Sequence, residues 1–349
     1  MVTLLLFRKR ILISRRWFSL LNFLNNSTIS LNGRKSHHHS AKNAISFHDY
    51  LPINGIQQWV SIDGQQKTNP ILFIIHGGPA STYSMFTKAT QLFSTHFTVV
   101  HWDQRGAGKT YLKQPVVPKN LQTLVDDGLA LTKQLKHAFP KAPIVLLGSS
   151  IGSIIANLML QQGENLYAAY IATEQMTSRS HQVAFNHLLS ESKDHLLKKS
   201  WLNKLPYDAG TWSAKQIAQF NVFSALQQTD VPNMVTDLFI KNLLHTYGLN
   251  VRDWSAFCRG LLASRQAIQP ELDSFDYRRL LSKTDVPFFV FQGSHDPITP
   301  AAATRTYFNQ VQAPDKQMII VPNSGHLCFF ANPQFFLDKL VNVVLPVLD

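Results

Sequence analysis

One stretch decides how this chain folds: PIVLLGSSIGSIIAN at residues 143–157. Residues 144–147 form a continuous apolar run with the length and β-branched content of a strand buried on both faces. Residues 148–152 then match G-x-S-x-G, and the apolar spacing of residues 151–160 predicts a helix. Strand, G-x-S-x-G and helix in this order are typical of a nucleophile elbow, a sharp turn that presents a reactive serine.

The geometry of such a turn selects Ser150 rather than Ser149 or Ser153 as the reactive residue. Small neighbours are needed there, and Gly148 and Gly152 let the strand and the helix approach closely. The N-terminus of the following helix favours a developing negative charge beside the serine. A Ser/Gly-rich turn without chemistry fits the same pattern, so the prediction needs support from elsewhere in the chain.

Strands and helices alternate on both sides of this stretch. Buried strands are predicted at residues 71–75, 98–102, 167–172, 287–291 and 317–321, with a first strand at 57–62. Helices are predicted at residues 121–138, 301–311 and from 333 onward. This alternation predicts an α/β fold, with a mostly parallel sheet covered by helices on both faces.

The alternation stops between residues 173 and 285. Amphipathic segments replace it, among them residues 183–197, 234–245 and 251–262, and they predict an inserted helical cap folded over one edge of the sheet. The predicted organisation is a basic N-terminal extension at residues 1–48, a first core part at 49–173, the cap at 174–285 and a second core part at 286–349.

The net charge of +12 is concentrated in the N-terminal extension, which holds eight basic residues and no acidic one. The remaining 25 Lys and Arg residues face 21 Asp and Glu residues, a balance of +4, so we predict no nucleic-acid partner. No apolar run there approaches the roughly 18 residues needed to span a bilayer. Two interpretations stay open: an amphipathic segment, either a peripheral membrane contact through residues 1–24 or an organellar presequence, and a disordered leader.

The two cysteines, Cys258 and Cys328, form neither a disulfide framework nor a metal cluster. A reducing compartment is compatible with them, and we predict a cytoplasmic protein without a metal or an organic cofactor.

Two further reactive groups follow predicted strands. Asp296 lies in the loop after the strand that ends at residue 291, and His326 lies in the loop after the strand that ends at residue 321. The chain order Ser150, Asp296, His326 predicts a catalytic triad in which His326 takes the serine proton and Asp296 fixes the histidine tautomer. His295 is a rival base, but it adjoins Asp296 in sequence instead of facing it, and we favour His326.

An oxyanion hole requires two backbone N–H groups. We predict one from Ile151, at the head of the elbow helix, and the other from Gly78 in the segment His76-Gly77-Gly78-Pro79. Glycines after a buried strand let the backbone approach a substrate, although a plain Gly-Pro turn fits the same residues.

Together these motifs resemble the α/β-hydrolase superfamily and, within it, most closely the prolyl-iminopeptidase-like branch. The resemblance rests on HGGP at residues 76–79, DQRGAG at 103–108, the elbow, Gly293-x-x-Asp296 and Ser324-Gly325-His326, and spans about residues 55–175 and 285–347. It implies a serine hydrolase that acts on a small molecule or short peptide through an acyl-enzyme. Release of an N-terminal proline is the leading expectation; a carboxylesterase and a non-catalytic hydrolase-fold binding protein are the alternatives.

Three departures from that branch are visible. Ala80 stands where the family usually has glycine, and Ile151 stands where iminopeptidases usually have tryptophan. Those enzymes also hold the substrate amine with acidic cap residues, for which the candidates here are Glu174, Glu191 and Glu271. Each is expected to be a solvated surface charge, and Glu174 is the one we select as a substrate-binding candidate.

Overall fold

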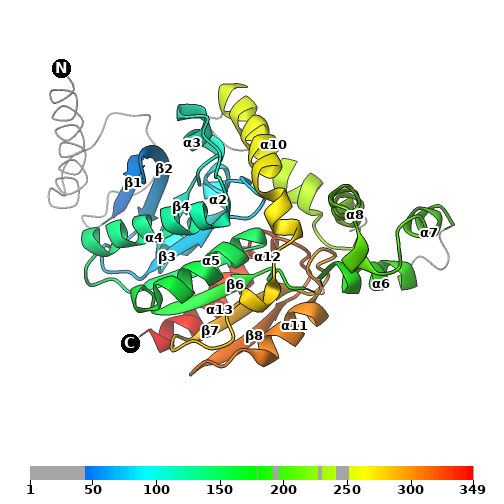
Figure 1. Ribbon diagram of the computed structural model, residues 1–349. Coiled ribbons are helices and arrows are strands. Elements are labelled where there is room, and N and C mark those ends of the chain that lie inside the picture. Colours follow the sequence, from blue (N-terminus) through cyan, green and yellow to red (C-terminus); the bar gives the residue numbers. More distant parts are fainter. Residues whose placement is uncertain (1–43, 179, 192–195, 227–229, 241–250, 349) are drawn as a thin grey trace, which may run out of the picture.

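The computed structural model describes residues 44–178, 180–191, 196–226, 230–240 and 251–348. One eight-stranded sheet lies at its centre, with strand order β1-β2-β4-β3-β5-β6-β7-β8 (Figure 1). The strands are β1 (Ile45–Ile53), β2 (Ile56–Gly64), β3 (Ile71–Ile75), β4 (Thr98–Trp102), β5 (Ile144–Ser149), β6 (Ala169–Thr173), β7 (Phe288–Gly293) and β8 (Lys316–Val321). Strands β3 to β8 are parallel, whereas β2 is antiparallel to both β1 and β4. The predicted mostly parallel sheet is confirmed.

Helices lie between and beyond these strands. The α-helices are α2 (Thr87–Thr90), α3 (Gly108–Lys113), α4 (Leu121–Ala138), α5 (Ile151–Gln162), α6 (Ser180–Glu191), α7 (Leu196–Leu202), α8 (Ala214–Leu226), α10 (Val251–Asp273), α11 (Ala301–Gln310), α12 (Cys328–Ala331) and α13 (Pro333–Lys339). Short 3-10 segments span Ser84–Phe86, Gln91–Thr95, Glu164–Leu166, Ala209–Thr211, Tyr277–Arg279 and Leu345–Val347, and π-helical segments span Met234–Ile240 and Leu340–Val344. The predicted helix at residues 121–138 matches α4 at both ends.

The sheet separates two large apolar cores. Strand residues alternate between them, as the two-residue period of a strand requires: Phe73 of β3 packs on the side of α4 and α5, whereas Leu72 and Ile74 pack on the side of α13. The elbow strand behaves in the same way, with Leu146 in the first core and Leu147 in the second. A parallel sheet covered on both faces explains why these strands carry apolar residues on both faces.

Between β6 and β7 all described elements are helical, as predicted. Helices α6 to α8 extend beyond the sheet in Figure 1 and share a small core of their own. Its buried members are Ala184, Phe185, Leu188, Leu202, Ala209, Trp212 and Phe220. In contrast, α10 packs on the main body: the hydroxyl of Ser264 donates to the Gly106 carbonyl at 3.1 Å, and Ile268 joins the first large core.

Strand β1 is a feature that the sequence analysis missed. It begins at Ile45, so the folded core starts before residue 49, where the sequence analysis placed its boundary. β1 pairs with β2 through a tight turn at Asn54 and Gly55, whose φ angles are 42° and 87°. Asn-Gly is the pair that a two-residue hairpin turn favours. Much of β1 is polar and exposed, so it lacks the apolar run that marked the other strands.

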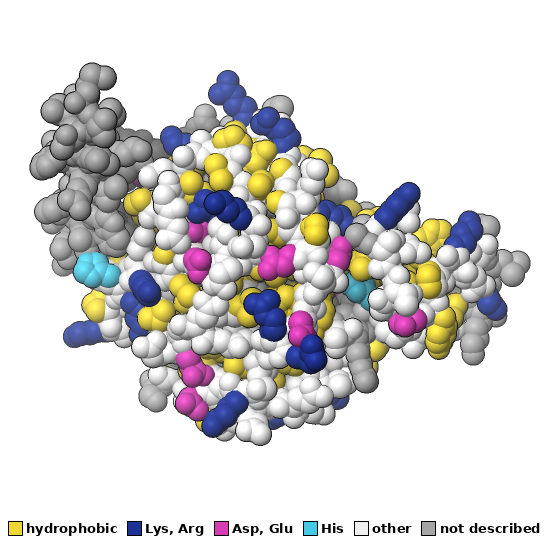
Figure 2. All heavy atoms as spheres, viewed as in Figure 1, with side chains coloured by type: hydrophobic (Ala, Val, Ile, Leu, Met, Phe, Trp, Pro, Cys, Tyr) yellow, Lys and Arg dark blue, Asp and Glu magenta, His cyan; other side chains and the backbone are white. Residues whose placement is uncertain are grey.

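The membrane and presequence interpretations concern residues 1–24, which lie outside the described residues, as does part of the predicted helix at 234–245. Within the described ranges, none of the helices has both the length and the apolar content of a bilayer-spanning segment. On the face shown in Figure 2, Lys and Arg side chains are spread out, with Asp and Glu among them, instead of gathering in one patch.

Candidate active site

Ser150 occupies the sharp turn between β5 and α5. Its backbone has φ 56° and ψ −126°, a strained combination for a residue with a side chain. A Cβ atom on Gly148 would lie 2.6 Å from the Ala156 Cβ, and one on Gly152 would lie 2.2 Å from the Ile75 carbonyl oxygen. Strand and helix therefore pass so close together that only glycine fits at both positions, as the elbow pattern predicts.

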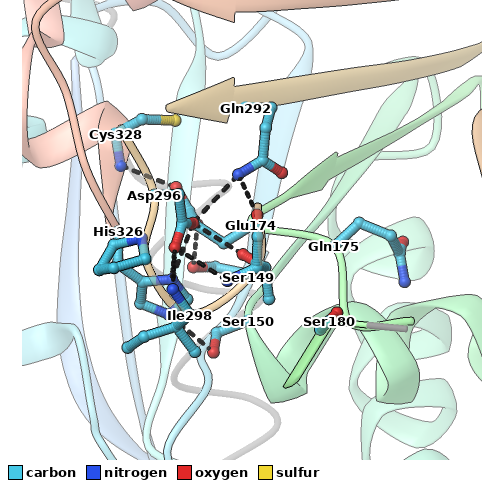
Figure 3. Close-up of polar contacts among 12 residues, drawn as sticks. Ser149, Ser150, Glu174, Gln175, Ser180, Gln292, Asp296, Ile298, His326 and Cys328 are labelled. Atoms are coloured by element: carbon cyan, nitrogen blue, oxygen red, sulfur yellow. Dashed lines mark hydrogen bonds and ion pairs between the residues drawn. The ribbon is translucent and has the colours of Figure 1, made fainter. Parts of the chain in front are cut away.

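The turns after β5, β7 and β8 bring Ser150, Asp296 and His326 together (Figure 3). The Ser150 Oγ lies 3.0 Å from the His326 Nε2, and the His326 Nδ1 lies 2.9 Å from the nearer Asp296 oxygen. His295, the rival base, is exposed and hydrogen-bonds to Ser294 instead. These contacts assemble the three residues that the chain order predicted, in the expected sequence of serine, imidazole and carboxylate.

Asp296 is held by a set of donors that leaves its carboxylate little freedom. One oxygen accepts from the backbone N–H groups of Ile298 and Thr299, at 2.8 and 2.9 Å. The other accepts from the Thr299 hydroxyl at 2.7 Å and from the Gln292 side-chain amide at 3.0 Å. Burial by itself would raise the pKa of Asp296, but His326 and the hydrogen bonds from Thr299 outweigh it, so the pKa lies below its ordinary value.

The pKa of His326 shifts in the opposite direction to that of Asp296. Its burial favours the neutral ring and would lower the pKa, but the neighbouring carboxylate of Asp296, with a smaller contribution from Glu174, raises the pKa above the ordinary histidine value. With Asp296 on Nδ1, the neutral ring has Nε2 free to accept a proton from Ser150. The arrangement thus suits a general base.

The HGGP segment lies directly against Ser150. A Cβ atom on Gly77 would lie 2.8 Å from the Ser150 Cβ and 3.3 Å from the Ile151 nitrogen. Gly78 has φ +123°, a conformation that disfavours side chains, and Ala80 follows with φ 57°. The predicted oxyanion donors, Gly78 and Ile151, therefore belong to two segments that meet beside Ser150.

The DQRG segment is hydrogen-bonded to the HGGP segment and to the residues that follow it. The Gln104 side-chain amide donates to the His76 carbonyl at 2.9 Å, and the Gln104 backbone N–H donates to the His76 Nε2 at 3.3 Å. Asp103 accepts from the hydroxyls of Thr82 and Ser84. The DQRG segment therefore fixes the conformation of the HGGP segment and the residues after it by hydrogen bonds. The sequence alone did not reveal this contact.

The acidic residues require a correction. Glu174 is completely buried, and its two oxygens accept from the Ser149 hydroxyl at 2.8 Å and the Cys328 N–H at 2.7 Å (Figure 3). The expectation of a solvated charge is wrong for this residue, because its carboxylate is closed off from solvent and both oxygens are engaged within the chain. Glu271 accepts from the Leu121 N–H at the start of α4, whereas the Glu191 side chain lies outside what the structure describes.

No group of three or more metal-ligating side chains occurs among the residues described. Several polar groups around Ser150 contact one another. Three of them escaped the sequence analysis: Gln292, Thr299 and the hydroxyl of Tyr83, which lies 2.9 Å from the Ser149 Oγ. Gln292 and Thr299 flank Asp296 in sequence, so their position beside it was a usable signal.

Comparison with known proteins agrees with the fold. The family model for the alpha/beta hydrolase fold matches residues 70–333, and this chain belongs to that family. The resemblance inferred from the motifs is thereby confirmed.

The relatives carry peptidase names. The protein called "Probable aminopeptidase YbaC" of Bacillus subtilis (strain 168) is 29% identical over 314 residues, covering 86% of this chain and 96% of that protein. A proline iminopeptidase of Levilactobacillus brevis is 24% identical over 311 residues, covering 84% and 94%. The structure of a proline iminopeptidase-related protein from Thermus thermophilus matches with a TM-score of 0.57 at 19% identity, covering 87% of this chain and 98% of that one. This chain is similar to peptidase-named hydrolases along most of its length.

Proposed function

We propose that this chain is a serine hydrolase that cleaves a small amide or ester through an acyl-enzyme. Ser150 is the nucleophile, His326 the general base and Asp296 the carboxylate that orients the histidine. The proposal rests on one observation: the unbroken hydrogen-bonded path from the Ser150 Oγ through both nitrogens of His326 to Asp296, at 3.0 and 2.9 Å.

The proton moves along this path. As the Ser150 oxygen attacks the substrate carbonyl carbon, its proton passes to the His326 Nε2, and Asp296 stabilises the imidazolium. His326 then gives the proton to the leaving amine or alcohol, the C–N or C–O bond breaks, and an acyl-serine remains. Water attacks the acyl-serine with His326 again as base, which releases the acid and restores the serine. The N–H groups of Gly78 and Ile151 would stabilise each oxyanion, and one such donor contributes about 3 kcal/mol.

Release of an N-terminal proline is the leading specific activity. It is supported by the HGGP and DQRGAG segments and by relatives named aminopeptidase and proline iminopeptidase. Such a substrate would place its carbonyl carbon at Ser150 and its free secondary amine under the inserted helices.

A carboxylesterase is the second candidate, and one observation favours it. Within the part of the chain that the structure describes, four carboxylates between β6 and β7 are engaged by the chain itself: Glu174 is buried, and Asp208, Asp237 and Glu271 accept from backbone N–H groups. An ester carries no amine that requires such a carboxylate.

The test has two parts. Turnover of a proline arylamide is compared with turnover of short acyl nitrophenyl esters, and labelling by a fluorophosphonate probe is followed in the wild type, Ser150→Ala, His326→Ala and His295→Ala. We expect labelling in the wild type and in His295→Ala, and none in the other two variants. An inert proline arylamide beside rapid ester turnover would select the esterase. A wild-type protein that neither labels nor turns over any of these substrates would instead support a non-catalytic binding protein.

A further inference from the structure

Glu174 is a buried carboxylate that the proposed triad does not use. It directly follows β6, the strand between β5 and β7, and it has the left-handed φ of 50°. A completely buried carboxylate is costly unless donors surround it. Here one oxygen accepts from the hydroxyl of Ser149 and the other from the backbone N–H of Cys328. These two donors come from the turns that carry the nucleophile and the base.

The two contacts connect parts of the chain that are far apart in sequence. Ser149 immediately precedes Ser150, and Cys328 follows His326 by two residues. Leu327, between His326 and Cys328, also has a left-handed backbone, with φ 67°. Such a strained conformation persists only where contacts on both sides hold the turn. The Tyr83 hydroxyl lies 2.9 Å from the Ser149 Oγ and extends the chain of contacts. Because Ser149 donates its proton to Glu174, Tyr83 is the donor to Ser149.

The charges around this cluster are few. Tyr83 and Cys328 have pKa values raised by burial and by Glu174, and the buried His76 has its pKa lowered to about 4, so all three are neutral near pH 7. Asp296 remains as the direct partner of His326. Among the ion pairs between described residues, none gives Glu174 a Lys or Arg partner. Glu174 acts electrostatically on His326, so the imidazolium produced during the reaction is a cation that its carboxylate can stabilise.

We infer that Glu174 is a positioning residue whose buried carboxylate fastens the Ser150 turn to the His326 turn and supplies a second negative charge that favours the protonated histidine. This inference rests on the proposed serine-hydrolase function. It gives the residue a role different from holding a substrate amine, and it explains why an acid is buried behind the nucleophile.

Glu174→Gln is the decisive variant because it removes the charge and can keep both contacts. Its oxygen can accept from the Cys328 N–H, while its amide donates to the Ser149 hydroxyl. Glu174→Asp keeps the charge on a shorter side chain and is the matched control. The readout is the pH dependence of the fluorophosphonate labelling rate at Ser150, which depends on neutral His326 and requires no knowledge of the natural substrate.

For Glu174→Gln we expect the acidic limb of the labelling profile to move down by about one pH unit and the plateau rate to fall about tenfold. Glu174→Asp should keep the limb within a few tenths of a unit of the wild type. An unmoved limb in a folded Glu174→Gln protein would overturn the inference, even if the plateau fell.

Ser149→Ala covers the case in which Glu174→Gln does not fold. It removes one contact and leaves the carboxylate, so the plateau should fall while the limb stays in place. A limb that moves by about one unit in Ser149→Ala would overturn the charge argument. A wild-type protein that is not labelled at Ser150 is a different result, because it removes the proposed function itself.

Discussion

Two regions of the molecule differ in backbone conformation and in the contacts that stabilise them: the turns around Ser150, and the helices α6 to α8. Left-handed φ angles occur at six described residues other than glycine, and five of these residues follow the carboxyl ends of β3, β5, β6 and β8: Ala80, Ser150, Glu174, Asn323 and Leu327. None of the six lies in the described parts of α6 to α8. The site is strained and held by hydrogen bonds, whereas the helices are relaxed and held by aromatic packing around Trp212 and Phe220.

This contrast indicates that the turns and the helices have different roles. Strain accumulates where reactive groups must be held against their preferred conformations, and the packed sheet underneath stabilises it. The helical unit has its own small core, separate from the two cores of the sheet. It also contacts one of the turns, because the Ser224 hydroxyl of α8 donates to the Pro297 carbonyl at 2.6 Å. We therefore expect the chemistry to depend on the turns and the choice of substrate to depend on the helices.

The largest effect is expected from Asp296→Asn. The asparagine can keep the shape of the turn, but its amide favours the wrong histidine tautomer, so the labelling rate and the turnover should both fall about 10⁴-fold. The melting temperature should change little, because the loss is one of activity and the fold is retained. A variant with more than a tenth of wild-type activity would show that Asp296 does not orient His326.

The next effect concerns pH. His326 must be neutral to accept the serine proton, and its pKa lies above the ordinary value because the neighbouring carboxylates outweigh burial. The rate should therefore be highest well above pH 6.5 and fall about tenfold per pH unit below the raised pKa. A labelling profile from pH 5 to 9 checks this. A half-maximal rate clearly below pH 6.5 would contradict the direction of the shift.

A third prediction separates the two regions directly. Phe220→Ala opens the small core of α6 to α8 and should cost about 3–5 kcal/mol of that core's packing. We expect faster hydrogen exchange in these helices, reduced turnover of the proline arylamide, and nearly unchanged labelling of Ser150 by a small probe. The matched control is Phe336→Ala in the core beneath the sheet, which should also lose labelling. Equal losses of labelling in both variants would break the comparison.

The smallest effect is expected from Ala80→Gly. Alanine at φ 57° costs about 1 kcal/mol relative to glycine, which reaches this conformation freely. Glycine gains flexibility in the unfolded chain, and the buried Ala80 methyl group is lost, so the net stabilisation should lie between zero and about 1 kcal/mol. Urea unfolding monitored by tryptophan fluorescence measures it. A clear loss of stability would mean that packing of the methyl group outweighs the backbone strain.

The sequence predicted what depends on local pattern. Buried parallel strands are rich in apolar residues, so β3, β4 and β5 could be located, and the residues that follow them share one end of the sheet. Ser150, Asp296 and His326 were expected to meet for that reason, and the structure places them within hydrogen-bonding distance of one another. Strand β1 was missed because its polar, exposed residues resemble a loop.

The role of Glu174 could not be predicted from local pattern. Its partners, Ser149 and Cys328, lie 25 and 154 residues away, and only the strand order places the end of β6 between the ends of β5 and β7. A glutamate after a strand therefore looked like a surface charge. The aromatic core of α6 to α8 was hidden in the same way, because its members come from separate helices with loops between them.

The position of Ile45 has a practical consequence. It starts β1, which forms one edge of the sheet and runs in the same direction as the parallel strands, so it lies at their amino ends. Ser150, by contrast, follows a carboxyl end. A linker fused in place of residues 1–43 and attached to a bead or an electrode would leave the end of the sheet that carries Ser150 turned toward the solution, which would suit an immobilised form of the proposed hydrolase.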